Sequence, residues 1–198
     1  MISGVILFPG AGTNANHKSL IAIEDRIKKS SNEIQSHVQV RRVDFPYRIA
    51  GKSFPDRAPV LIETVRSAVF EATKDWGCAT NQIVIGGRSM GGRMCSMAVA
   101  ETERKLDVAA LVCICYPLHP PKQPEKLRSE HLPQINVRTL FISGTRDEFG
   151  TVDELENATT KISSEVTHKW IQDARHDLKN RDDEVAELVA HWIMALPS

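Results

Sequence analysis

Six apolar runs recur along the chain and are separated by segments with a different hydrophobic period. The runs are rich in β-branched residues, and several are continuously apolar, as in strands covered on both faces. We expect strands at residues 4–8, 37–43, 82–86, 108–115, 137–142 and 166–171. The intervening segments repeat apolar residues at steps of three and four, which predicts amphipathic helices. This alternation predicts an α/β fold with a mostly parallel six-stranded sheet and helices on both faces.

Two of the helical patterns are well defined. One stripe begins at Leu61 and ends at Trp76, with Asp56 as its expected N-cap. The other begins at Val185 and ends at Leu196, with Asn180 as its expected cap and acidic residues complementing its positive end. Two weaker helices are indicated by apolar residues at Leu20, Ile23 and Ile27, and at Leu155, Ala158 and Ile162.

Length and composition restrict the function classes. A chain of 198 residues fits one domain, residues 1–198, and its 25 basic and 25 acidic side chains give no net charge that would favour nucleic acid or an anionic membrane. The apolar N-terminal run is too short for a signal peptide or a membrane span. The cysteines lack metal-type spacing, which predicts reduced thiols and a cytoplasmic location: Cys78, Cys95, Cys113 and Cys115.

The third predicted strand runs into a serine flanked by small residues. Ligand sites of parallel sheets lie at the carboxyl ends of the strands, so the loops after the strands are where chemistry is expected. Gly87 and Gly91 lie two residues before and two after Ser89. A nucleophile on a sharp strand-to-helix turn needs such small neighbours, because the strand and helix backbones nearly touch there. A glycine-rich turn with a polar tip is the alternative, but the predicted strand and helix favour a nucleophilic Ser89.

The loops after the fifth and sixth predicted strands carry an acid and a base. Asp147 follows the fifth strand and His176 follows the sixth, so the order along the chain is Ser, Asp, His. This is the order in α/β-hydrolases, in which residues from separate strand ends converge into a triad. Asp147 could instead be a turn residue, and Glu148 beside it is a second candidate acid.

The loop after the first strand is expected to supply part of an oxyanion hole. It reads FPGAG, and its small residues let the backbone approach a substrate carbonyl. We assign the backbone N–H of Ala11, paired with that of Met90 directly after the serine. The loop lacks the glycine and lysine pattern of a phosphate-binding loop.

Two long proline-rich loops, residues 44–59 and 116–136, follow the second and fourth strands. Both are expected to overhang the strand ends and to form the substrate pocket, although each could be a plain connection. The expected pocket residues are Phe45, Tyr47, Arg88, Tyr116 and His119. The basic residues Lys52, Arg57 and Arg88 favour an acidic substrate.

Several segments together resemble a known family. GGRSMGGR, FPGAG, CICYPLHPPKQPEKLRSEHLP and FISGTRDEFG are similar to the predicted α/β-hydrolases related to testis-expressed protein 30 and the third subunit of the NSL acetyltransferase complex. These in turn resemble the dienelactone-hydrolase branch. The resemblance implies the α/β-hydrolase fold and carries Ser89, Asp147 and His176 into the triad positions. Two features depart from it: we expect the first two antiparallel strands of the fold to be missing, and the dienelactone branch often uses cysteine as nucleophile, where this chain has serine.

These features predict a serine hydrolase of the carboxylesterase or thioesterase type. Its substrate would be a small-molecule acyl ester or thioester, with no metal or organic cofactor and no nucleic-acid or membrane partner. Two alternatives stay open. The chain could be a catalytically silent interaction module, since the family has members that act in complexes, or an acyltransferase that uses the same triad. The sequence does not indicate an oligomeric state.

Overall fold

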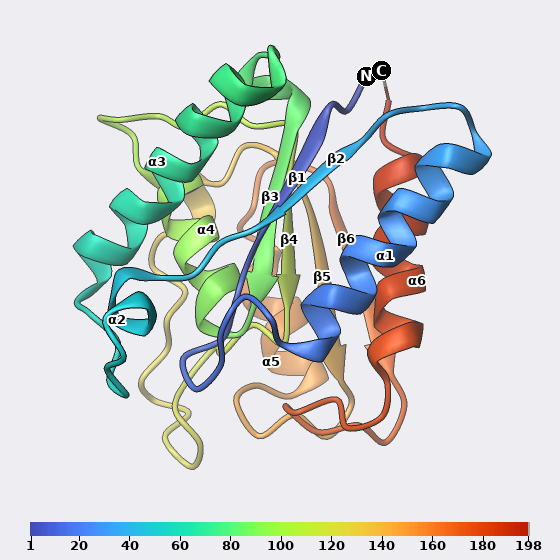
Figure 1. The fold of residues 1–198 in the computed structure, drawn as a ribbon. Coiled ribbons are helices and arrows are strands. Elements are labelled where there is room, and N and C mark those ends of the chain that lie inside the picture. Colours follow the sequence, from blue (N-terminus) through green and yellow to red (C-terminus); the bar gives the residue numbers. More distant parts are fainter. Residues whose placement is uncertain (198) are drawn as a thin grey trace.

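The computed structural model describes residues 1–197, and its centre is one six-stranded sheet in the order β2-β1-β3-β4-β5-β6. All five neighbouring pairs are parallel, so every strand ends at the same edge, the lower one in Figure 1. The six predicted strands are confirmed with small shifts at their ends, and the sheet is fully rather than mostly parallel. The strands are β1 (Gly4–Phe8), β2 (Gln39–Arg42), β3 (Ile83–Arg88), β4 (Ala110–Ile114), β5 (Arg138–Gly144) and β6 (Val166–Ile171).

Helices cover both faces of this sheet (Figure 1). Two pack together on one face, α1 (Lys18–Glu33) and α6 (Asp182–Met194). The other face is covered by α3 (Ala58–Trp76), α4 (Met90–Ala100) and α5 (Val152–Thr159). The short α2 (Pro46–Ile49) and two 3-10 turns, Thr80–Gln82 and Leu132–Gln134, lie in the connections.

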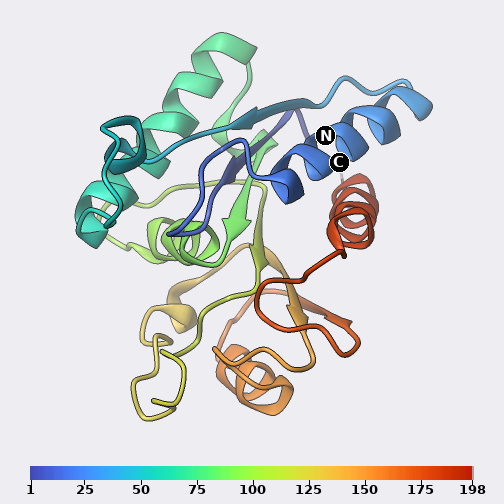
Figure 2. The same ribbon diagram turned by 60° about the horizontal axis from the view of Figure 1, so that its bottom comes forward.

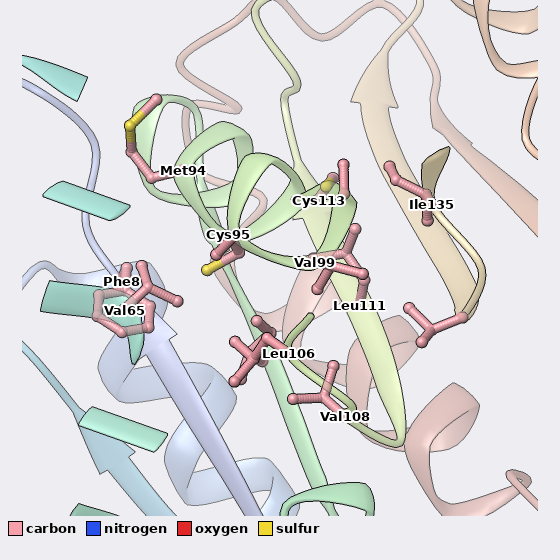
Figure 3. Packing of buried hydrophobic residues seen from close by; sticks show 14 of the residues in the cluster. Phe8, Val65, Met94, Cys95, Val99, Leu106, Val108, Leu111, Cys113 and Ile135 are labelled. Atoms are coloured by element: carbon pink, nitrogen blue, oxygen red, sulfur yellow. The ribbon is translucent and has the colours of Figure 1, made fainter. Parts of the chain in front are cut away.

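The central strand β4 shows why its sequence is continuously apolar. All five of its residues are buried, and they alternate between the two faces of the sheet. Leu111 and Cys113 join the core under α3 and α4, whereas Val112 joins the core under α1 and α6. Figure 3 shows the first of these cores, where side chains of α4 such as Val99 gather over Leu111. Both faces of β4 are therefore shielded from solvent, and no position on this strand suits a polar residue.

Two predicted helix caps are wrong by one residue. Helix α3 begins at Ala58, so its N-cap is Arg57 rather than Asp56. Pro59 sets this start, because proline fits the first turn of a helix but not its interior. The N-cap of α6 is Arg181, since Asn180 has a positive φ of 60° and belongs to the preceding turn.

The four cysteines are free thiols, as predicted. Burial raises the pKa of Cys95, Cys113 and Cys115, which keeps these thiols protonated and unreactive. Within residues 1–197, no helix has both the length and the apolar character that crossing a membrane requires.

Candidate active site

The loops that follow β1, β3, β4, β5 and β6 enclose a cavity of about 690 Å³ at the carboxyl edge of the sheet. Figure 2 brings this edge forward. The cavity is lined by residues of all five loops and of the helices that begin there. They are Gly10, Ala11, Gly12, Thr13, His17, Lys18, Arg88, Ser89, Met90, Arg93, Pro117, Arg128, Phe149, His176, Asp177 and Lys179.

Ser89 lies on the turn between β3 and α4 with a backbone conformation that is unfavourable for its residue type. Its φ is 50° and its ψ is −115°, outside the regions that residues with a side chain commonly adopt. Two hydrogen bonds hold it there: the Ser89 N–H donates to the Ile114 carbonyl at 2.7 Å, and the Arg93 N–H donates to the Ser89 carbonyl at 3.0 Å. Strain of this kind persists only where the surroundings impose it, and it is typical of functional turns.

Gly87 and Gly91 are required by the close approach of a third segment as well as by the turn itself. A Cβ atom on Gly87 or on Gly91 would overlap the carbonyl oxygen of Phe8 at the end of β1. A Cβ on Gly87 would also lie 3.0 Å from the Gly91 carbonyl carbon, which is the strand-to-helix contact expected from the sequence. The two glycines therefore hold the serine turn against the loop that follows β1.

Ser89, His176 and Asp147 form one continuous hydrogen-bonded chain. His176 Nε2 lies 2.9 Å from Ser89 Oγ, and His176 Nδ1 lies 2.9 Å and 3.0 Å from the two carboxylate oxygens of Asp147. Asp147 is only 4% exposed, whereas Ser89 and His176 reach the cavity. The structure thus brings together the three residues that the sequence selected from separate strand ends.

The imidazole of His176 is held on several sides. Its ring packs on the Phe149 ring with centroids 4.0 Å apart. Its own backbone carbonyl accepts a hydrogen bond from Arg88 at 2.9 Å, and its backbone N–H donates to Glu148 at 3.4 Å. The alternative acid Glu148 therefore binds the backbone of His176, and Asp147 alone of the two contacts the ring. The Phe149 N–H in turn donates to Asp147 Oδ1 at 2.9 Å, which orients the carboxylate.

Ala11 and Met90 both line the cavity beside Ser89. Among residues 1–197, neither backbone N–H donates to another protein group, so both donors stay available. The Tyr47 hydroxyl donates to the Ala11 carbonyl at 2.7 Å and fixes the peptide that follows Ala11. Met90 is the first residue of α4, where free N–H groups and the positive end of the helix dipole favour an anion.

Four of the five residues expected in the pocket wall are instead buried away from the cavity. Phe45 stacks on Phe8 with centroids 5.5 Å apart, and Tyr47 packs beside it in the core. Tyr116 is 2% exposed and donates its hydroxyl proton to the Arg128 carbonyl. His119 is 5% exposed and pairs with Pro120 and Glu154. These four side chains pack in the protein interior. Of the five expected residues, Arg88 alone lines the cavity.

The sequence did not single out several residues that do line the cavity: Thr13, His17, Lys18, Arg93, Pro117, Arg128, Phe149, Asp177 and Lys179. Arg93 alone carried a readable signal, because it lies four residues after Ser89 and so occupies the same side of α4 one turn later. Pro117 and Arg128 come from the 116–136 loop, as expected of a pocket wall. None of the lining residues comes from the 44–59 loop, and its basic residues Lys52 and Arg57 are exposed elsewhere.

A second serine and histidine also lie within hydrogen-bond distance of each other. Ser96 Oγ is 2.8 Å from His131 Nε2. Ser96 is completely buried within α4, however, and its hydroxyl proton is donated to the Arg93 carbonyl at 2.7 Å. The imidazole therefore donates to Ser96 rather than accepting its proton. This pair joins α4 to the 3-10 turn at Leu132–Gln134 and is not a candidate nucleophile.

One group of potential metal ligands lies beneath the cavity. The ligand atoms of Cys115, Asp147 and His176 lie within 4.8 Å of one another. Burial keeps the pKa of the Cys115 thiol raised, whereas a cysteine must lose its proton to bind a metal. Both Asp147 oxygens are already paired with His176. The chemistry of this donor set does not favour a cation.

Sequence comparison identifies the family. Residues 3–196 match a family described as an alpha/beta hydrolase domain. The chain belongs to this family. Since the match spans nearly all of the described residues, the family assignment covers both the sheet and the loops around the cavity.

Solved structures with the same fold include several hydrolases. Dienelactone hydrolase from Anabaena variabilis superimposes with a TM-score of 0.76 at 18% identity, over 100% of this chain and 88% of that chain. Est1E from Butyrivibrio proteoclasticus gives 0.73 at 14% identity over 98% and 87% of the two chains. An alpha-beta serine hydrolase homologue from Coxiella burnetii gives 0.71 at 19% identity over 97% and 85%. At these identities the likeness concerns the fold.

Proposed function

We propose that this hydrolase-family protein is a serine esterase or thioesterase that uses Ser89, His176 and Asp147 as a catalytic triad. The observation that carries the proposal is the hydrogen-bonded chain from Ser89 Oγ through His176 to Asp147, which opens onto a cavity at a strained strand-to-helix turn. The printed names of two structural neighbours, an alpha-beta serine hydrolase homologue and an esterase domain of a Rhodothermus marinus protein, agree with it. Within the family, we propose the closer relationship to the testis-expressed protein 30 group that the sequence motifs indicate.

The reaction begins with acylation of Ser89. His176 Nε2 accepts the proton of the Ser89 hydroxyl as Oγ attacks the substrate carbonyl, and Asp147 stabilises the imidazolium that forms. The oxyanion of the tetrahedral intermediate is bound by the N–H groups of Ala11 and Met90, a contribution of about 3–4 kcal/mol per donor in comparable sites. His176 then returns the proton to the leaving alcohol or thiol, which leaves Ser89 as an acyl ester.

Deacylation repeats the same steps with water. His176 accepts a proton from the incoming water, whose oxygen attacks the acyl carbonyl, and then donates the proton to Ser89 Oγ as the acid departs. The His176 ring is held against Phe149 and oriented by the Asp147 carboxylate, so it is in position for both acylation and deacylation. If another alcohol or thiol took the place of water, the same residues would catalyse acyl transfer.

A fluorophosphonate probe tests the proposal directly, because it reacts only with an activated serine. We expect covalent labelling of the wild type, mapped by mass spectrometry to Ser89, and no labelling of Ser89→Ala. The matched control is Ser53→Ala, since Ser53 is an exposed serine outside the cavity.

A folded wild type that resists the probe and cleaves no ester or thioester would overturn the proposal in favour of the interaction module. Labelling at Ser89 combined with faster product formation on adding an alcohol or thiol acceptor would favour the acyltransferase.

A further inference from the structure

The cavity beside Ser89 is lined by many more basic than acidic side chains. Asp177 is the one acidic residue of its lining, against five that carry a full positive charge: Lys18, Arg88, Arg93, Arg128 and Lys179. Lys18 has a partner, Asp182, at 2.9 Å. In the part of the chain that the structure describes, no carboxylate lies within salt-bridge distance of the three guanidinium groups. The cavity therefore carries positive charge that the protein itself does not neutralise.

Arg93 and Arg128 carry most of this unmatched charge into the cavity. The Nε of Arg93 is buried and has no hydrogen-bond partner. Arg128 makes one long contact, from its guanidinium to the Pro117 carbonyl at 3.4 Å. Arg88 differs, because its guanidinium already binds the His176 carbonyl. Neither the Arg93 nor the Arg128 guanidinium has a carboxylate partner among the described residues, so both are available to an anion that enters the cavity.

Neighbouring groups respond to the same positive charge. Burial lowers the pKa of Arg128, and the adjacent charge of Arg93 lowers it further. Burial and then Arg93 also lower the pKa of His131, to about 4. Two guanidinium groups close enough to repel each other are stabilised when an anion binds between them.

The two arginines come from elements other than the loop that carries His176. Arg93 is one turn into α4, and Arg128 is in the 116–136 loop, whereas His176 is in the loop after β6. His176 returns its proton to the leaving group, so the leaving group must lie beside the imidazole. The acyl chain then extends toward α4 and the 116–136 loop.

We propose that the substrate of this site carries a carboxylate on its acyl side, which Arg93 and Arg128 bind together. The proposal rests on the esterase function proposed above. It names the substrate class as half-esters or half-thioesters of dicarboxylic acids. Planar guanidinium groups match a carboxylate in charge and in geometry, which explains two arginines rather than an apolar wall at this position.

The test compares esters that differ only in this charge. We expect wild-type kcat/KM for 4-nitrophenyl hemiadipate to exceed that for its methyl ester by about tenfold or more. The double variant Arg93→Gln, Arg128→Gln should lose that preference and still hydrolyse the methyl ester. The loss should appear as a higher KM for the charged ester. Arg93→Lys should keep part of the preference, because lysine keeps the positive charge at this position. The control Arg57→Gln changes an arginine outside the cavity and should match the wild type.

The outcomes separate the two proposals. Equal kcat/KM for the charged and neutral esters, or an equal loss on both esters in the arginine variant, overturns the carboxylate site and leaves the esterase function intact. A preference for 4-acetoxybenzoate over its methyl ester, with none for hemiadipate, places the anion on the leaving-group side and also overturns it. A protein that cleaves none of these esters and resists the fluorophosphonate probe overturns the proposed function itself.

Discussion

The chain contains two serine–histidine pairs whose serines are seven residues apart, and the distance from Oγ to Nε2 is almost the same in both. Ser89 Oγ is 2.9 Å from His176 Nε2, and Ser96 Oγ is 2.8 Å from His131 Nε2. Their surroundings differ in three ways. Ser89 has a strained backbone, opens onto a cavity and has a carboxylate behind its histidine, whereas Ser96 is helical, fully buried and paired with a histidine that donates to it. The distance alone therefore does not identify a nucleophile.

The largest difference between the pairs should be in turnover. His176→Gln removes the general base, and the loss in kcat should reach about 10⁴ to 10⁶, the range for members of comparable triads. His131→Gln should leave kcat on a short neutral ester within about threefold, because His131 touches no reacting atom in the proposed mechanism. Steady-state kinetics of the two purified variants provide the measurement. Similar losses in both would contradict the assignment of His176.

The turn that holds Ser89 should be sensitive to added volume. Gly91→Val places a branched side chain against the Phe8 and Pro9 carbonyls, and we expect a loss of about 2 kcal/mol or more in the free energy of unfolding. Gly12→Ala is the matched control, since a Cβ at Gly12 meets no atom within 4 Å. Urea unfolding of both variants tests this. A Gly91→Val protein as stable as the wild type would mean that the turn has room to move.

Sequence reasoning reached the Ser89 pair because its requirements are local. A serine between glycines at a strand end is a short-range pattern. The carboxyl ends of parallel strands lie at one edge of the sheet, so the positions of Asp147 and His176 could be predicted from the sequence alone. The pocket wall depends instead on how long loops pack. Phe45 and Tyr47 were expected at the wall, but both are buried in the apolar core. Arg128 reaches the cavity from a loop whose path no hydrophobic periodicity predicts.

The same limit explains why the buried pair was not foreseen. His131 lies in a loop, and only tertiary packing brings it to the Ser96 hydroxyl of α4. The cap of α3 was predicted one residue too early, because Pro59 sets the start of this helix at Ala58. Patterns within one helix or strand can thus be predicted from the sequence, whereas contacts between a loop and a helix cannot.

The buried histidine should make stability depend on pH. Burial and the Arg93 charge lower the pKa of His131 to about 4, against about 6.5 in the unfolded chain. Between these values the unfolded state binds the proton first, so the folded state loses stability as the pH falls from about 6.5 to about 4. His131→Gln removes this contribution. Its unfolding free energy should change less steeply with pH in this window, by up to about 1.4 kcal/mol per pH unit.

Urea titrations of wild type and His131→Gln at several pH values between about 4 and 7 measure this difference in slope. Other groups titrate equally in both proteins, so their contribution cancels. Parallel curves for the two proteins would show that His131 is not held neutral by its surroundings.

The smallest effect sharpens the contrast between the two serines. Ser96→Ala removes a buried hydroxyl that binds the Arg93 carbonyl and His131, so it should cost about 1 kcal/mol of unfolding free energy and leave kcat for a neutral ester unchanged. Ser89→Ala should do the reverse: it should abolish turnover at equal or slightly higher stability, because strained functional positions commonly cost stability. Thermal melts and ester kinetics on the two alanine variants, run side by side, measure both quantities. If Ser96→Ala abolished turnover while Ser89→Ala retained it, the nucleophile would be the buried serine, and backbone strain and cavity access would not be what distinguishes the two pairs.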